Sequence, residues 1–244
     1  MKLNESDILE LLKEESPSRV FGLSLLPKNL GEDDFYAQSI DKMSYKFNYR
    51  ENIKSFSDSR SKEFLMGRFC AHQALKKFIP YEHQVKIEAN EDRSPQWPKL
   101  SGHSIKGSLS HNESLVCALV VAGVRGLGID LESRGRLNER LASKVVFEED
   151  LSYESLEDLP WSREDYFTFI FSAKEALYKT LYPQVEKFFG FSEAYISSFD
   201  FGRRTFEISI HPDSFLAQWE GIDQKFKGRF LESDDEVLTI IIWD

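Results

Sequence analysis

The chain has 244 residues and a formal net charge of −10 at pH 7, and 41% of its residues are hydrophobic. This apolar content is enough for a substantial core and argues against a disordered chain, while the length fits one large domain or two small ones. The acidic balance argues against nonspecific nucleic-acid binding, because such binding needs a basic surface. Cys70 and Cys117 both lie in apolar patterns and are expected to be buried thiols of a reducing cytosol.

The first residues of the chain contain no apolar stretch of the kind found in secretory signals. The longest apolar run, residues 115–123, is too short to cross a bilayer. We therefore expect a cytoplasmic protein with no membrane-bound part. Asp7, followed three positions later by Glu10, predicts the start of a short helix that reaches Leu12.

Two helices of similar sequence are predicted at residues 58–78 and 162–181. With an offset of 102 positions, five of nine aligned residues in the second halves of these helices are identical. This similarity reflects either ordinary helical patterning or an internal duplication that produces two similar lobes. The strand-like segments 115–121 and 237–243 favour the duplication, and a ligand cleft would then be expected between the lobes.

The segment between the two helices contains a loop and a strand. Residues 90–106 are rich in turn formers and include Arg93. Ser108–His111 alternates as a strand, and a lone histidine beside an apolar strand is usually a structural residue. Towards the end of the chain, residues 205–210 form a further predicted strand that carries no chemistry of its own.

An acidic strand is predicted at residues 127–132. Side chains alternate along a strand, so Asp130 and Glu132 share one face. Two neighbouring carboxylates repel each other unless a cation lies between them. Their oxygen atoms suit Mg²⁺, which leaves coordination positions for water and substrate phosphates. The alternative is an edge strand with a solvated acidic face.

A basic segment, residues 133–144, follows the acidic strand. It combines four cationic side chains with apolar Leu137 and Leu141, which are four positions apart. In an acidic protein, such a segment suits an acidic helical partner, although a solvated loop and helix would have the same sequence pattern. The acidic run that follows, residues 148–150, is predicted to be a solvated turn or helix start. The cationic residues of the segment are Arg134, Arg136, Arg140 and Lys144.

The second long helix presents charged side chains away from its apolar stripe. Glu175 and Lys179 are four positions apart on the polar face, and Lys174 lies at the edge of the stripe. A solvated salt bridge on an amphipathic helix is one interpretation. It leaves Phe167 and Phe171 unexplained, because they also lie off the stripe and require a second packed surface or a ligand wall.

Three stretches, taken in order, resemble the signature motifs of the 4′-phosphopantetheinyl transferases, most closely those of the enterobactin-type branch, which has two lobes as in the surfactin-type proteins. The stretches are Gly107–His111, Gly128–Glu132 and Phe171–Lys179. The sequence departs from the family pattern at Phe171, where other branches have Trp, and at Ser94, where other branches have Lys.

The resemblance implies an α+β fold of two similar lobes related by a pseudo-twofold axis, in a monomer. Residues 1–122 would form the lobe that recognises the nucleotide of coenzyme A. Residues 123–244 would form the lobe with the metal site, the catalytic helix and the carrier-protein docking surface.

The implied activity is that of a holo-[acyl-carrier-protein] synthase. The 4′-phosphopantetheine arm of coenzyme A is transferred to a serine of an apo acyl or peptidyl carrier protein, and 3′,5′-ADP is released. Such a reaction would serve siderophore or other natural-product biosynthesis. Two other activities remain open, a metal-dependent phosphodiesterase or nucleotidyl transferase and a non-catalytic scaffold that binds carrier proteins.

The resemblance also implies roles for individual residues. Glu175 would take the proton of the attacking serine, with a metal-bound water as the alternative base, and Lys174 and Lys179 would neutralise the charge that develops on the phosphates. The expected Mg²⁺ ligands are Asp130, Glu132 and Glu175. The expected contacts to coenzyme A are Arg60, Arg68, Arg93, Ser110, His111, Lys174 and Lys179. The expected contacts to the carrier protein are Arg134, Arg136, Arg140 and Lys144.

Overall fold

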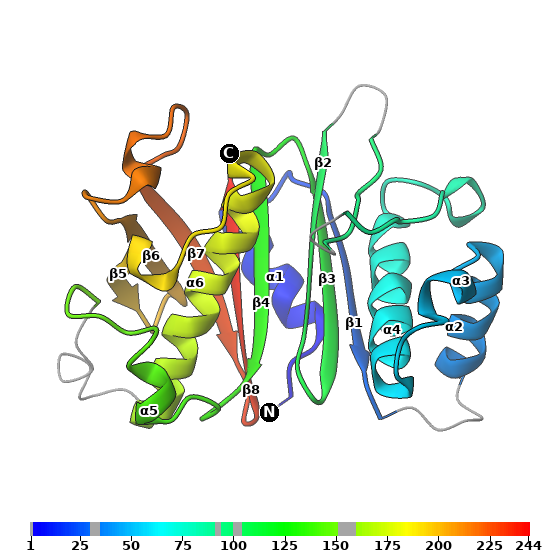
Figure 1. The fold of residues 1–244 in the computed structure, drawn as a ribbon, viewed down its shortest axis with the longest axis horizontal. Coiled ribbons are helices and arrows are strands. Elements are labelled where there is room, and N and C mark those ends of the chain that lie inside the picture. The colour runs from blue at the N-terminus through cyan, green and yellow to red at the C-terminus, as the bar shows by residue number, and fades with distance from the viewer. Residues whose placement is uncertain (1, 30–34, 91–93, 100–103, 151–159) are drawn as a thin grey trace. The chain divides into compact units, whose positions relative to one another are not determined.

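The computed structural model of the chain describes all residues except 1, 30–34, 91–93, 100–103 and 151–159 (Figure 1). It contains two compact units. Residues 13–124 form the N-terminal unit, and residues 1–12 together with 125–244 form the C-terminal unit. The unit boundary expected after residue 122 therefore lies after residue 124, and the first twelve residues, which include most of helix α1 (Glu5–Glu15), group with the second half of the chain.

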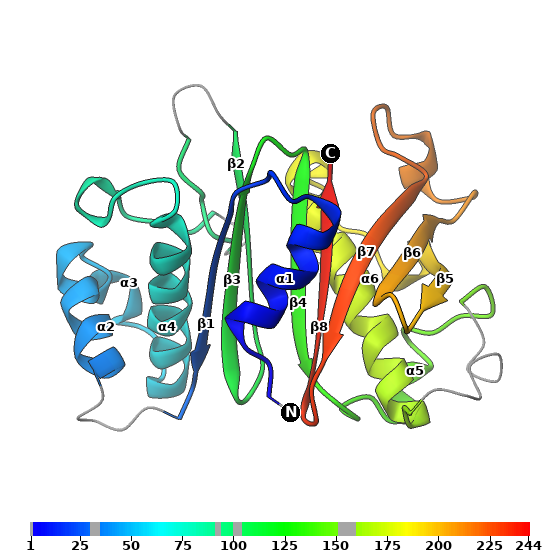
Figure 2. The same cartoon turned by 180° about the vertical axis from the view of Figure 1, so that it is seen from behind.

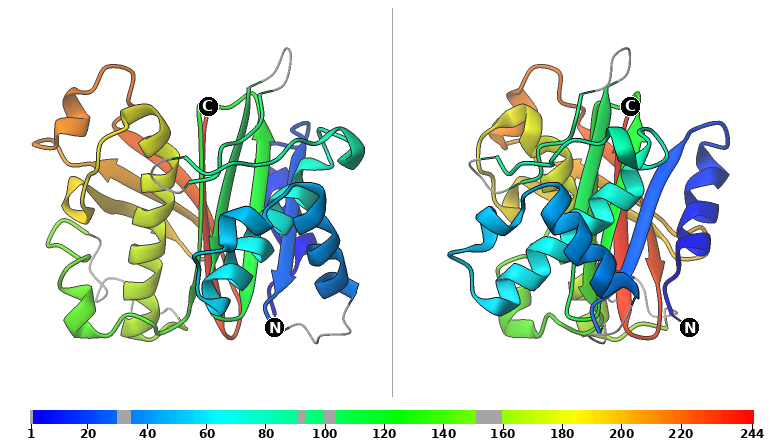
Figure 3. Two further views of the ribbon diagram at one scale, coloured as in Figure 1. Left: turned by 45° about the vertical axis from the view of Figure 1, so that its right-hand side comes forward. Right: turned by 90° about the vertical axis from the view of Figure 1, so that its right-hand side faces the viewer.

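The N-terminal unit is a long helix on a three-stranded antiparallel sheet. The strand order is β1-β3-β2, and helix α4 packs along β1 and β3 (Figure 3). Ser57 caps the amino end of α4, where its hydroxyl accepts a hydrogen bond from the backbone of Arg60. The elements are β1 (Phe21–Pro27), α2 (Phe35–Lys46), α3 (Arg50–Ile53), α4 (Asp58–Leu75), the short 3-10 helix η1 (Tyr81–His83), β2 (Ile105–His111) and β3 (Leu115–Ala122).

A buried polar network fills part of this unit's core. His72 of α4 is 0% exposed, and its ring stacks on Phe47 with 4.0 Å between the ring centroids. Its Nδ1 lies 2.7 Å from the side-chain oxygen of Gln84, and its Nε2 lies 3.1 Å from the hydroxyl of Tyr49. Burial lowers the pKa of His72 to about 4, although the hydrogen bond to Gln84 opposes this shift. His72 is therefore neutral in the folded protein near pH 7.

The neutral His72 predicts a loss of stability in mild acid. The unfolded chain binds a proton at this histidine near pH 6.5, whereas the folded protein does so only near pH 4, so stability falls as the pH decreases through this window. We expect this group alone to lower the free energy of unfolding by about 2 kcal/mol between pH 7.5 and pH 5. Urea unfolding at both pH values measures this difference. His72→Gln, which does not titrate, is the control, and an equal loss in that variant would contradict the prediction.

The C-terminal unit is a long helix on a five-stranded antiparallel sheet of order β4-β8-β7-β6-β5. Helix α6 crosses the face of β4 and β8, and the opposite view shows the strands in front of it (Figures 1 and 2). The elements are β4 (Gly126–Ser133), α5 (Glu139–Ala142), α6 (Arg163–Val185), the 3-10 helices η3 (Phe191–Glu193) and η4 (Phe215–Gln218), β5 (Ala194–Asp200), β6 (Thr205–Ile210), β7 (Lys225–Glu232) and β8 (Glu236–Trp243).

Helix α6 has the amino end that its sequence predicts. Ser162 and Asp165 form a reciprocal capping box, in which each side chain accepts a hydrogen bond from the other residue's backbone. The helix continues four residues beyond the predicted end, through Pro183 to Val185. Phe167 is buried in the core and Phe171 packs against it, so a second packed surface accounts for both.

The two units share one topology. In each unit a strand is followed by the long helix and then by a hairpin, and the first strand pairs antiparallel with the second strand of the hairpin. The strands and helices that correspond are β1 with β4, α4 with α6, β2 with β7, and β3 with β8. The C-terminal unit has the additional hairpin β5–β6. This repetition supports the internal duplication over coincidental helical patterning.

Two glycines mark the same close approach in both units. A Cβ atom at Gly22 in β1 would lie 2.0 Å from the carbonyl oxygen of Ala74 in α4. A Cβ atom at Gly128 in β4 would lie 1.9 Å from the carbonyl oxygen of Ala176 in α6. Ala74 and Ala176 are partners in the offset of 102 positions, so each unit requires glycine where its strand touches its helix. The fold is thus α+β with two similar lobes, and their pseudo-twofold relation and the monomeric state stay predictions.

Candidate functional site

The two acidic residues of β4 lie against α6. Asp130 and Glu132 are 4% and 8% exposed, and one carboxylate oxygen of Asp130 lies 2.7 Å from Nζ of Lys179. Nζ of Lys179 also donates to the backbone carbonyl of Ile129 at 3.0 Å. Ser172, about two turns nearer the amino end of α6, donates to the backbone carbonyl of Asp130 at 3.2 Å. The helix and the strand are therefore held together at the acidic residues.

The carboxylates of this region repel one another. Burial and the charge of Asp130 raise the pKa of Glu132 to about 7, against the opposing charge of Arg136. Burial and the charge of Asp130 also raise the pKa of Glu175 above its ordinary value, against the charge of Lys179. Asp130 thus influences both glutamates electrostatically, and the joint binding of a metal ion by the three carboxylates stays a prediction.

These carboxylates suit a divalent cation by their chemistry, although they do not form a closed cage. Within the part of the chain that the structure describes, no three His, Cys, Asp or Glu side chains are close enough to hold a metal ion as they stand. Asp130 is paired with Lys179, and Glu132 is paired with Arg136. Carboxylate oxygens are nevertheless the ligands that Mg²⁺ prefers, and a divalent cation would remove the like-charge repulsion that raises the pKa of both glutamates.

Lys174 lies elsewhere than the sequence led us to expect. Its ammonium group is buried and lies 2.7 Å from the carboxylate of Asp150. Asp150 is likewise buried, so the prediction of a solvated acidic turn is wrong at this residue. The pairing explains the difference, because each buried charge satisfies the other.

Two of the four cations of the basic segment are paired with carboxylates of this chain, and the side chains of the other two are exposed. Arg134 pairs with Asp165 at 2.7 Å near the start of α6, and Arg136 pairs with Glu132. Arg140 and Lys144, in and just after α5, are exposed. Leu141, which lies between them in the sequence, is 46% exposed.

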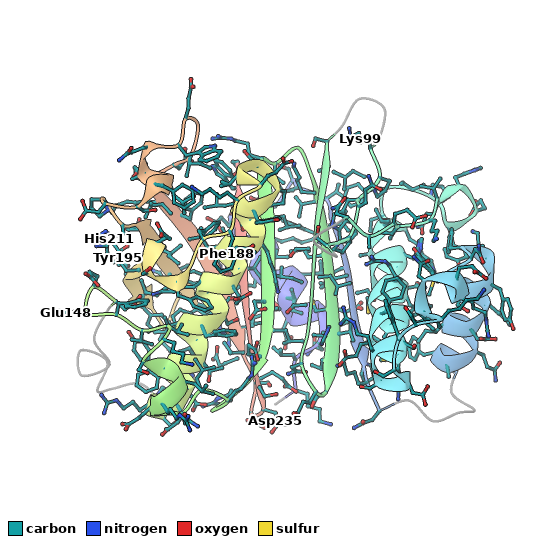
Figure 4. The ribbon with its side chains drawn as sticks, viewed as in Figure 1. Lys99, Glu148, Phe188, Tyr195, His211 and Asp235 are labelled. Atoms are coloured by element: carbon teal, nitrogen blue, oxygen red, sulfur yellow. The ribbon has the colours of Figure 1, made fainter. Side chains whose placement is uncertain are left out.

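An apolar pocket of about 240 Å³ lies beside Glu175 of helix α6. Lys174, Glu175 and Tyr178 of α6 line one part of it, and Phe188 and Phe189, which follow α6, line another. Phe188 is 76% exposed and projects beside α6 (Figure 4). The pocket therefore offers an apolar wall next to a carboxylate.

A basic cluster in the N-terminal unit contains a residue that the sequence analysis missed. Nζ of Lys28, just after β1, lies 3.3 Å from Nδ1 of His111 and 3.2 Å from the carboxylate of Glu63. Arg60 approaches the same carboxylate at 3.7 Å. Because β1 and β2 both flank β3, the ends of β1 and β2 come together, and no sequence motif marks this position.

Two other expected coenzyme contacts are less accessible. Arg68 is 4% exposed, and its guanidinium lies over the ring of Phe64 and donates to the backbone carbonyl of Glu88. Ser110 of β2 is also buried. Arg93 lies outside the described residues.

Family comparisons match both halves of the chain. Residues 48–121 match the model of the 4′-phosphopantetheinyl transferase N-terminal domain, and residues 126–241 match that of the 4′-phosphopantetheinyl transferase superfamily. The chain belongs to the 4′-phosphopantetheinyl transferase superfamily. The first matched range lies within the N-terminal unit and leaves out residues 13–47, whereas the second covers most of the C-terminal unit and extends beyond the three sequence motifs into β8.

Two known members of this superfamily are similar over most of the chain. The 4′-phosphopantetheinyl transferase Npt of Nocardia iowensis is 29% identical over an alignment of 194 positions, which covers 76% of this chain and 83% of Npt. The 4′-phosphopantetheinyl transferase PptT of Mycobacterium tuberculosis is 28% identical over an alignment of 183 positions, which covers 71% of this chain and 75% of PptT. The likeness to the enterobactin-type branch stays a prediction.

In this 4′-phosphopantetheinyl transferase, the sequence identified the acidic strand and the helix that faces it. The structure brings Asp130 and Lys179 into contact and places Glu132 and Glu175 within electrostatic reach of them. Lys174 instead forms a buried pair with Asp150.

None of the helices in the described ranges is long and apolar enough to cross a bilayer.

Proposed function

We propose that this protein transfers the 4′-phosphopantetheine arm of coenzyme A to a serine of an apo acyl or peptidyl carrier protein and releases 3′,5′-ADP. Membership of the superfamily supports the reaction class. The observation that carries the proposal is the contact between Asp130 on β4 and Lys179 on α6, with Glu132 and Glu175 in the same electrostatic environment. This arrangement suits chemistry on a pyrophosphate.

Asp130, Glu132 and Glu175 would together hold a Mg²⁺ ion. When bound, such an ion supplies positive charge to the phosphate oxygens. Burial and the charge of Asp130 raise the pKa values of Glu132 and Glu175, and a cation would offset that repulsion, which supports this assignment.

The protein's own residues would handle the proton and the remaining charge. The serine hydroxyl of the carrier attacks the β-phosphorus, a new phosphoester bond forms, and the bond to the 3′,5′-ADP oxygen breaks. Glu175, at the edge of the apolar pocket, would take the serine proton. Lys179 would provide fixed positive charge, and one well-placed donor of this kind contributes about a hundredfold in rate.

The apolar pocket beside Glu175 suits the uncharged arm of coenzyme A. Its walls include the aromatic rings of Tyr178, Phe188 and Phe189, and its volume is about 240 Å³. Apolar walls with a few polar groups at one end are typical of small-molecule sites. The arm would lie there with its phosphate end near Glu175.

The basic cluster of the N-terminal unit would hold the phosphates of the nucleotide. Lys28, His111 and Arg60 lie around the single carboxylate of Glu63, whose pKa the Lys28 hydrogen bond and charge lower despite the opposing effect of burial. A phosphate would offer these cations stronger hydrogen bonds. Arg68, Ser110 and Arg93 remain further candidates for coenzyme contacts.

Lys28→Met is expected to raise KM for coenzyme A by about tenfold or more, because a charge-assisted hydrogen bond to a phosphate contributes about 1.5–3 kcal/mol. KM for the carrier protein should not change. Steady-state kinetics with each substrate varied in turn measures both constants. Lys77→Met, which removes an exposed lysine after α4, is the matched control. A KM for coenzyme A equal to that of the control would remove Lys28 from the site.

The short helix α5 and the residues that follow it, together residues 139–145, are called the α5 segment. Its exposed basic part would dock the carrier protein. Arg140 and Lys144 present positive charge, and exposed Leu141 offers an apolar contact, so the segment suits an acidic amphipathic helix. Arg134 and Arg136 would contribute less, because each is already paired with a carboxylate of this chain.

Mass spectrometry of apo carrier proteins incubated with this protein, coenzyme A and Mg²⁺ tests the function. A panel from siderophore, polyketide and fatty-acid systems also identifies the pathway served. Arm transfer adds about 340 Da to one serine, the mass of the phosphopantetheine group, and a Ser→Ala carrier is the control. Hydrolysis of coenzyme A without a carrier would instead favour a phosphodiesterase, and carrier binding without modification would favour a scaffold.

A further inference from the structure

A buried ion pair lies on the side of α6 that faces the segment after α5. Nζ of Lys174 is 2.7 Å from Oδ2 of Asp150, and the two side chains are 2% and 0% exposed. The same Nζ donates to the backbone carbonyl of Val145 at 2.9 Å. Two of the three ammonium protons are thereby committed to acceptors of this chain.

Asp150 joins three parts of the C-terminal unit. Its Oδ2 also accepts from the backbone of Phe147 at 2.9 Å, and its Oδ1 accepts from the backbone of Ile196 in β5 at 2.8 Å. With Lys174, it therefore links the segment 145–150, helix α6 and strand β5. A buried pair whose hydrogen bonds are this complete tolerates the loss of one partner poorly, because the other charge is left unsatisfied.

The two lysines of the helix motif differ in what they can reach. The side chain of Lys179 is 28% exposed and its charge lies at the acidic strand. Lys174 is almost fully enclosed and its charge lies against Asp150. A lysine that binds a substrate phosphate must present its N–H groups to that phosphate, and of these two lysines only Lys179 has a side chain exposed enough to do so.

We propose that Lys174 and Asp150 are a positioning pair that holds the α5 segment against the helix that carries Glu175, and that the ammonium group of Lys174 binds no phosphate of the coenzyme. The carbonyl that Lys174 holds belongs to Val145, directly after exposed Lys144, and α5 itself packs on α6 (Figure 1). The pair thus sets where a partner docked on Arg140 and Lys144 stands relative to Glu175. This last role rests on the proposed function, whereas the pairing itself does not.

A double-variant cycle of Lys174→Met and Asp150→Leu tests the pair without any substrate. Each single variant should lower the thermal midpoint by about 10 °C, because one buried charge loses its partner. The thermal midpoint of the double variant should lie above those of the single variants by at least half of that loss, since neither charge is left without a partner. Strictly additive losses would overturn the pairing. As a matched control, Lys225→Met breaks the exposed pair with Glu207 and should shift the midpoint by less than about 2 °C.

Steady-state kinetics well below the midpoints tests the positioning role. Both single variants should raise KM for the carrier protein by about tenfold and leave KM for coenzyme A within about twofold of the wild type. The double variant should be no worse than the poorer single variant, and it carries the kinetic test if a single variant fails to fold. A raised KM for coenzyme A in Lys174→Met alone, at an unchanged midpoint, would make Lys174 a phosphate contact and overturn the proposal. If the wild type transfers no arm, the proposed function fails, while the midpoints still decide the pairing.

Discussion

Asp130→Asn is expected to lower kcat/KM for arm transfer by about a thousandfold and to move the thermal midpoint by only a few degrees. The substitution removes a carboxylate oxygen that Mg²⁺ would need and the partner that holds Lys179 in place. The effect on stability is small because two changes oppose each other. The ion pair with Lys179 is lost, and the repulsion of Glu132 and Glu175 by Asp130 is relieved.

Steady-state transfer assays over a range of Mg²⁺ concentrations, together with thermal unfolding, measure both effects. Asp213→Asn, which makes the same change at an exposed site, is the matched control and should behave as the wild type. Removing divalent ions with a chelator should abolish transfer by the wild type, and added Mg²⁺ should restore it. Undiminished Mg²⁺-dependent transfer by Asp130→Asn would exclude a ligand role for this residue.

Reversal of two charges, in Arg140→Glu combined with Lys144→Glu, is expected to raise KM for the carrier protein by about tenfold to a hundredfold. Both side chains are exposed, so the change should leave the fold intact. Complementary surface charge acts chiefly on the rate of association, and the defect should therefore shrink as the salt concentration rises. KM for coenzyme A should remain that of the wild type.

The comparison variant for this prediction is Lys42→Glu combined with Lys77→Glu, which changes the net charge equally on exposed residues of the N-terminal unit. Kinetics with the carrier protein varied at low and high salt separates the two variants. Arg136 is left unchanged because its pairing with Glu132 would mix a docking effect with an effect on the acidic strand. An equal defect in both double variants would mean that overall charge, and not the α5 segment, attracts the carrier.

Much of the candidate site was predictable because its determinants are local. Alternation along β4 places Asp130 and Glu132 on one face whatever the strand packs against. The 3.6-residue period of α6 places Glu175 and Lys179 together on its polar side. Separately, the resemblance of the three motifs indicated the family that the wider match across residues 48–121 and 126–241 establishes.

The duplication was predictable only in part. Identities between the two long helices suggested it, but the strands that precede them share little sequence apart from one glycine each. Gly22 and Gly128 become recognisable as equivalent once each is seen against the carbonyl oxygen of Ala74 or Ala176. A close backbone approach constrains one residue of the strand and leaves its neighbours free to change.

The sequence by itself determined the acidic strand and the charged helix, since these depend on periodicity within single elements, and the resemblance of three motifs indicated the family. Only the tertiary structure decided that Lys179 and not Lys174 meets Asp130, that Asp150 is buried, and that Lys28 joins His111. Each of these outcomes depends on a partner distant in sequence, 24 residues away for Lys174 and 83 for Lys28. A local pattern states which way a side chain points from its own helix or strand, whereas the charge it meets there depends on how the rest of the chain packs around it.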